Sequence, residues 1–78
     1  MYVNSNNNYY SEWTILYNDL ETHYFNTEDE MLNYLSIKTN QKRIGQVYQK
    51  DYVFDGLDVY NTNTKLYNIN ELLTSINK

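Results

Sequence analysis

The chain has 78 residues with no cysteine and a single histidine, and ten acidic residues against six basic ones give it a net charge of −4. This length suits one domain, and the lack of cysteine excludes disulfides and thiolate metal sites. The acidic balance argues against direct binding of nucleic acid, which needs clustered lysine and arginine.

A core of this size gives limited stability, so we expect a homodimer or a permanent partner chain to add to it. The amino-terminal stretch is polar and rich in asparagine, which predicts a flexible leader over residues 1–11 and a single domain over residues 12–78. No secretory signal and no run of about 18 apolar residues is present, so we expect a cytoplasmic protein.

Residues 13–25 have the pattern of a β-hairpin. Apolar and polar residues alternate on both sides of Asn18-Asp19, a pair that tolerates the positive φ angles of a tight turn. A two-residue loop there predicts aromatic or β-branched cross-strand pairs: Tyr17 opposite Leu20, Ile15 opposite Thr22, and Trp13 opposite Tyr24.

Two helices are predicted from their capping residues. Thr27 stands three residues before Glu30, the spacing of a capping box, and the helix that follows should end near residues 36–38. Asn68 precedes Glu71 at the same spacing and opens a second helix. The predicted apolar faces consist of Met31, Leu32 and Leu35 with Tyr34 at the edge, and of Ile69, Leu72, Leu73 and Ile76.

The segment between the helices permits two strand arrangements after a strand over residues 43–49. In one, Asp55-Gly56 turns a hairpin between residues 52–54 and 57–60. In the other, residues 52–60 form one strand with Gly56 at a bulge, and the turn lies at Lys50-Asp51. Residues 61–64 are predicted as a loop from their Asn-Thr-Asn-Thr composition.

The predicted order is therefore β-β-α-β-β-α. This order favours an α+β fold in which a small antiparallel sheet of three to four strands carries two helices on one face.

The usual elements of an active site are missing from the sequence. There is no cysteine, no glycine-flanked nucleophilic serine and no glycine-rich phosphate loop. His23 beside Glu21 could act as a base, but residues two apart on a strand are ordinary same-face neighbours. Aspartates 51, 55 and 58 lack the ligand spacing of a calcium loop. We therefore expect a binding protein, not an enzyme, with no catalytic residue, cofactor or metal.

Acidic residues gather near the predicted turns and at the first helix start. If these places met at one end of the sheet, eight carboxylates, which include those of Asp19 and Glu21, would form one patch. Such a patch could imitate the phosphates of DNA and bind a basic groove. Alternatively, each acid caps a helix or protects a strand edge. The acidic candidates for partner binding are Glu28, Asp29, Glu30, Asp51, Asp55 and Asp58.

Ten tyrosines form the second candidate feature, although an AT-rich coding sequence also favours tyrosine and asparagine. Tyr48, Tyr52 and Tyr60 stand among the aspartates, whereas aromatic surfaces that stack single-stranded bases need basic surroundings. Tyrosine is enriched in protein interfaces, so we add these three to the partner-binding candidates and expect no direct contact with nucleic acid.

In length, charge, lack of cysteine and its composition rich in Asn, Tyr, Lys and Ile, the chain resembles phage-encoded anti-CRISPR and other anti-defence inhibitors. The resemblance implies a phage or mobile-element protein that binds and blocks a nucleic-acid-handling defence protein in the host bacterial cytoplasm. Its surface would act as an acidic, tyrosine-rich DNA mimic. Toxin-immunity proteins share this profile, so a generic protein-interaction module, such as an immunity protein or small adaptor, is the alternative. There, Trp13 and the tyrosines would provide the affinity.

Overall fold

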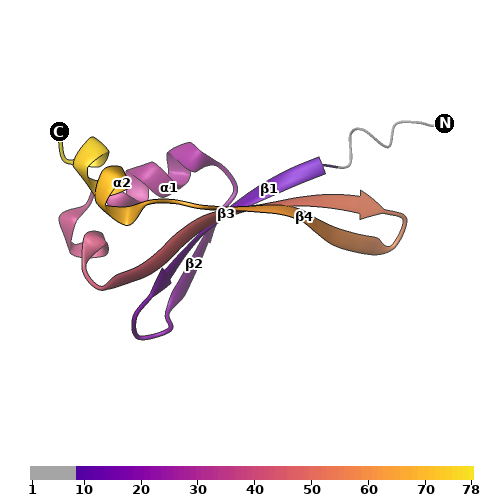
Figure 1. The fold of residues 1–78 in the computed structure, drawn as a ribbon, viewed down its shortest axis with the longest axis horizontal. Helices are drawn as coiled ribbons and strands as arrows, with labels where there is room; N and C mark the ends of the chain where they lie inside the picture. Colours follow the sequence, from indigo (N-terminus) through magenta and orange to yellow (C-terminus); the bar gives the residue numbers. More distant parts are fainter. Residues whose placement is uncertain (1–8) are drawn as a thin grey trace.

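The computed structural model describes residues 9–78 and contains one antiparallel sheet with the strand order β2-β1-β3-β4 (Figure 1). Helix α1 follows β2, a short 3₁₀ helix (η2) leads into β3, and helix α2 follows β4. The predicted α+β fold is confirmed. The bounds are β1 Tyr9–Tyr17, β2 Thr22–Phe25, α1 Glu28–Leu35, η2 Lys38–Gln41, β3 Ile44–Asp55, β4 Asp58–Leu66 and α2 Ile69–Ile76.

Both helices pack on one face of the sheet, and the core lies between them. Ile15 of β1 pairs directly with Val47 of β3, and both are fully buried. Met31 and Leu35 of α1 are also fully buried. From α2, Ile69, Leu72 and Ile76 pack against the same cluster. Because successive residues of a strand point to opposite sides, the neighbours of Ile15 and Val47 point away from the helices. We call the two sides of the sheet the helix face and the open face.

The predicted caps are present at both helix starts. The hydroxyl oxygen of Thr27 accepts a hydrogen bond from the backbone N–H of Glu30 at 3.1 Å. The Glu30 carboxylate accepts in turn from the backbone N–H of Asn26, one residue earlier than a standard capping box places it. The side chain of Asn68 accepts from the N–H of Glu71 at 3.1 Å. These hydrogen bonds fix the residue at which each helix begins.

The first hairpin is present, but its predicted pairing is wrong by one residue. The N–H of Leu20 donates to the carbonyl of Tyr17, and the N–H of Tyr17 donates to the carbonyl of Glu21, both at 2.9 Å. The loop therefore has three residues, with Leu20 in the left-handed region at φ 72°. Trp13 pairs with Phe25 and Ile15 with His23, so Tyr24 lies on the open face.

The second hairpin is present, as in the first of the two predicted arrangements, but its loop lies one residue later than the predicted Asp55-Gly56. Asp55 pairs with Asp58 across a two-residue loop, in which Gly56 has a φ angle of 64°. The alternative turn at Lys50-Asp51 is wrong, because β3 runs unbroken through these residues. The predicted loop over residues 61–64 is also wrong, because these residues lie in β4. Asp51 pairs with Asn63 and Tyr52 with Asn61, which leaves Thr62 as the extra residue of a bulge.

The predicted leader lies only partly within the described residues, because residues 1–8 fall outside them. Tyr9, Tyr10 and Ser11 belong to β1 and pair with residues 53, 52 and 51 of β3, so they are not part of a leader. Within residues 9–78, no helix is long and apolar enough to cross a membrane.

The far end of the sheet projects beyond the helices. In Figure 1 the helices gather at one end, and the β3–β4 hairpin extends from the other, in a molecule measuring 47 × 26 × 17 Å. We call this projection the arm and define it as residues 9–11 of β1 together with residues 51–63.

Candidate functional site

The arm carries most of the net charge of the protein. Its three ionisable carboxylates belong to Asp51, Asp55 and Asp58, and it has no lysine or arginine. The rest of the chain holds seven acidic and six basic residues and is therefore nearly neutral. The arm and α1 thus each carry a net charge of −3, but all six basic residues of the chain lie outside the arm and offset the acids of α1 and its surroundings.

All three arm carboxylates lie on the helix face. Asp51 pairs with Ser11, and Asp55 pairs with Asp58. Asp51 and Asp55 lie an even number of residues from the buried Val47 on β3, so they and their partners point to the same face as Val47. Tyr60 pairs with Val53, which also pairs with Tyr9, so both tyrosines share this face. Tyr9 is 64% exposed and Tyr60 50% exposed. The arm therefore has an acidic side that bears two exposed tyrosines.

Asp51 is held in place by its neighbours on three strands. Its carboxylate accepts hydrogen bonds from the hydroxyl of Ser11 at 2.6 Å, the amide of Gln49 at 2.9 Å and the amide of Asn63 at 3.4 Å. These donors, Ser11 foremost and then Gln49, lower the pKa of Asp51 below its usual value. Asp51 thus stays ionised while it joins β1, β3 and β4 at the base of the arm.

The carboxylates at the tip of the arm have fewer contacts. The hydroxyl of Tyr60 donates to Asp58 at 3.2 Å, and Asp55 and Asp58 face each other beside the exposed loop. Leu57 in that loop is fully exposed. A partner could reach these groups without any rearrangement of the fold.

The acids of the first helix have local roles instead. Glu28 accepts a hydrogen bond from the hydroxyl of Tyr67 at 2.6 Å, and Glu30 belongs to the cap; Asp29 stands between them in the first turn. The loop that holds Asp19 and Glu21 and the tip of the arm lie at opposite ends of the sheet (Figure 1). The turns and the first helix start therefore do not meet at one end of the sheet, and the eight carboxylates do not form one patch.

The structure separates Tyr48 and Tyr52 from Tyr60. Both lie on the open face, because Tyr48 pairs with Thr14 and Tyr52 with Tyr10. The rings of Tyr10 and Tyr52 stack with centroids 4.9 Å apart, and the ring of Phe54 stacks on Tyr10 at 5.1 Å. Burial, and after it the charge of Glu12, raises the pKa of Tyr52 above its usual value.

Several open-face residues were not among the sequence candidates. One row crosses all four strands through Tyr24, Thr14, Tyr48 and Leu66. Thr14 is buried within this row, whereas Tyr24 and Leu66 are each 64% exposed. The alternation of β1 would have identified Tyr10, but Tyr24 was assigned to the wrong face because the predicted hairpin register was wrong.

Trp13, considered as an affinity residue in the alternative function, lies on the helix face. Its indole N–H donates to the hydroxyl of Tyr67 at 3.0 Å, and the same hydroxyl donates to Glu28. Burial, and after it the contact with Glu28, raises the pKa of Tyr67 to about 12. This chain of hydrogen bonds connects β1 and α1 to the segment that precedes α2.

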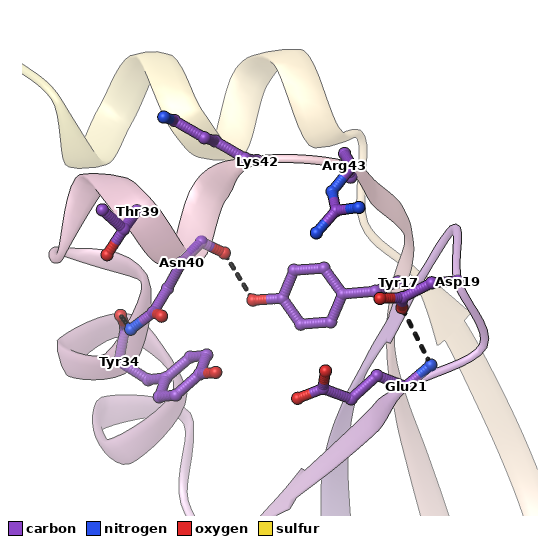
Figure 2. A pocket seen from close by; sticks show the side chains of 8 residues that line it. All are labelled: Tyr17, Asp19, Glu21, Tyr34, Thr39, Asn40, Lys42 and Arg43. Carbon is purple, nitrogen blue, oxygen red and sulfur yellow. Dashed lines mark hydrogen bonds between the residues drawn. The ribbon is translucent and has the colours of Figure 1, made fainter.

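A cavity of about 190 Å³ lies between the β1–β2 loop and η2 (Figure 2). The hydroxyl of Tyr17 donates to the carbonyl of Asn40 across it, and burial raises the pKa of Tyr17 above its usual range. Beside the cavity, His23 contacts Glu21 at 2.5 Å and the hydroxyl of Tyr34 at 3.3 Å. His23 therefore joins β2 to α1, and its role in the fold is accounted for by these contacts.

Comparison with known proteins gives no assignment: no family model, no curated protein and no solved structure matches this chain. Within residues 9–78, no group of three or more His, Cys, Asp or Glu side chains is placed to hold a metal ion.

Proposed function

We propose that this protein is an inhibitor that inserts its acidic arm into the basic groove of a nucleic-acid-handling protein. The observation that carries the proposal is the arm itself: a projecting hairpin with three carboxylates and no cation. A basic groove attracts such a surface over a distance of about 8–10 Å at moderate salt. The anti-defence class, with a phage or mobile element as source, is the biological setting that this chemistry fits best.

The binding residues of this inhibitor are those of the arm. Asp55, Asp58 and Tyr60 contact the partner at the tip, with Tyr9 beside them, and Asp51 maintains the shape and charge of the arm base. Exposed tyrosines next to carboxylates give the partner apolar contact area as well as charge, which a row of charges alone would lack. Glu28, Asp29 and Glu30 are left out because they serve the helix start.

The experiment compares two charge-matched double variants as bait for a bacterial lysate. One bait carries D55K and D58K at the tip, and the other carries D29K and E71K at the two helix starts. We expect wild-type protein and the helix-start variant to retain the same nucleic-acid-binding protein, identified by mass spectrometry, and the tip variant to lose it. Equal retention of that protein by both variants would contradict the proposal.

A general protein-interaction module is the second candidate, favoured by the exposed open-face row. In that case the partner would be lost from Tyr24→Ala and Tyr48→Ala baits, its retention would vary little with salt, and the tip variant would still retain it. The same set of baits therefore separates the two functions.

A further inference from the structure

We propose that the open face of the sheet is covered by a second copy of this chain, packed face to face. The proposal concerns the side of the sheet opposite the acidic side of the arm and stands independently of the inhibitor function. It would give an α-β-β-α arrangement with four helices outside and two sheets inside, a packing that sheets adopt readily.

The open face exposes several large apolar side chains among polar ones such as Gln46 and Asn61. Its exposed residues include Tyr10, Tyr24, Phe54, Val59 and Leu66, which are 40–64% exposed. The four strands have 9, 4, 12 and 9 residues, and at about 4.8 Å between strands and about 3.3 Å per residue they give a flat area of roughly 500 Å². Two such faces together cover about 1,000 Å², the lower end of the range for a specific interface.

Charge favours a second copy over an unrelated acidic or basic partner. The strands of the open face carry one acid and one base, Glu12 and Lys50, which are directly opposed in neighbouring strands. No ion pair joins them among the described residues; the Lys50 ammonium lies 5.4 Å from the ring centre of Tyr48 instead. The face is therefore neutral, and two chains of net charge −4 can meet on it without bringing carboxylates together.

A two-fold axis that runs parallel to the strands, between β1 and β3, makes this face complementary to itself. The rotation places β1 of one copy over β3 of its partner. Glu12 then lies opposite the partner's Lys50, Tyr10 opposite the partner's Tyr52, and Tyr24 opposite the partner's Leu66. Each pair joins one residue from each copy and occurs twice, as an isologous interface requires. Both arms project from the same end of the dimer, with their acidic sides outward.

The test is sedimentation equilibrium of the full chain over a range of concentrations, with two variants matched in residue type and exposure. Tyr24 and Tyr9 are both 64% exposed tyrosines, but they lie on opposite faces. We expect wild-type protein and Tyr9→Lys to reach twice the 9.5 kDa chain mass, and Tyr24→Lys to dissociate at least about 10-fold more readily. Circular dichroism checks that each variant folds.

A charge exchange provides a second, independent readout. Glu12→Lys alone and Lys50→Glu alone should each weaken the dimer, and the double exchange should restore it, because the pair across the axis is re-formed with opposite orientation. A wild-type chain that stays at 9.5 kDa up to about 1 mM overturns the proposal. So does a dimer that Tyr9→Lys disrupts and Tyr24→Lys does not.

Discussion

Tyr67 joins three parts of the fold through one hydroxyl group. It accepts from the indole of Trp13 and donates to Glu28, so removing the oxygen leaves a half-buried donor and a carboxylate without their partner. We expect Tyr67→Phe to lower the free energy of unfolding by about 1–2 kcal/mol, measured by urea denaturation.

The matched control is Tyr60→Phe. Among residues 9–78, the hydroxyl of Tyr60 hydrogen-bonds to Asp58 alone, at an exposed position, so its removal should change the free energy of unfolding by less than about 0.5 kcal/mol. Equal losses in the two variants would show that the Trp13–Tyr67–Glu28 chain does not stabilise the fold.

The same residue predicts how stability depends on alkaline pH. In the folded protein the pKa of Tyr67 is raised to about 12 from an ordinary 10.0, so the unfolded chain releases the proton first. The stabilisation is therefore complete below about pH 10 and is lost as the pH rises towards 12, and Tyr17 adds to the loss in the same direction. Denaturation curves from pH 9 to about 12 should show a shallower decline for Tyr67→Phe than for wild type. An unchanged decline would contradict this assignment.

At the scale of elements, the two hairpin loops both require a residue in the left-handed region and meet this requirement with different residue types. Leu20 adopts φ 72° although its side chain disfavours that region, whereas Gly56 adopts φ 64° without strain. We expect Leu20→Gly to raise the free energy of unfolding by about 0.5–1 kcal/mol and Gly56→Ala to lower it by about 1 kcal/mol. Thermal and urea denaturation measure both.

Leu57→Gly is the control for the loop substitutions. Leu57 is also an exposed leucine in a hairpin loop, but it is not among the residues of the described chain with positive φ. Glycine there relieves no strain and should leave stability unchanged or slightly lower. A gain in stability equal to that of Leu20→Gly would mean that backbone strain is not the cause.

The sequence predicted the elements that local interactions determine. The caps at Thr27 and Asn68, the turn beside Gly56 and the apolar faces of both helices follow from residues within one turn of each other. The failures came from longer-range competition. Asn18-Asp19 favours a two-residue loop, yet the N–H of Asn18 bonds to the carbonyl of Arg43 on the neighbouring segment at 2.8 Å, and the turn shifts to suit it. Residues 61–64 look like a loop but pair with β3, where Asn61 and Thr62 bond to the carbonyl of Asp51 at 3.0 and 3.2 Å.

The acidic residues of the candidate site could be identified from the sequence, but the face of the sheet on which each candidate lies could not. Asp51, Asp55 and Asp58 were identified from their charge, and their common face follows only from the unbroken alternation of β3 and the pairing of Asp55 with Asp58. Tyr60 of β4 lies on the same face as these aspartates, whereas Tyr48 and Tyr52 of β3 lie on the other face. Which of two faces a residue occupies depends on strand register, and register was the least predictable property of this chain.

At the scale of the whole molecule, the fold separates its surface by chemistry. The arm holds three of the four net negative charges, the rest of the chain is nearly neutral as a whole, and the open face exposes large apolar side chains with one acid and one base. This separation lets the molecule associate through one side without masking the charge on the other. The proposed dimer and the proposed inhibitor can therefore coexist, and each can be disproved without the other.

The most direct test of the central claim is a competition measurement with the purified protein that the wild-type bait captures. Labelled DNA is bound to that protein, and its displacement is followed by fluorescence anisotropy at salt concentrations from about 50 to 200 mM, where electrostatic binding weakens steeply. We expect wild type and the D29K/E71K variant to displace the DNA at low salt, with potency falling as salt rises, and D55K/D58K to displace none. Displacement by D55K/D58K equal to that of wild type would show that the acidic arm is not the binding element.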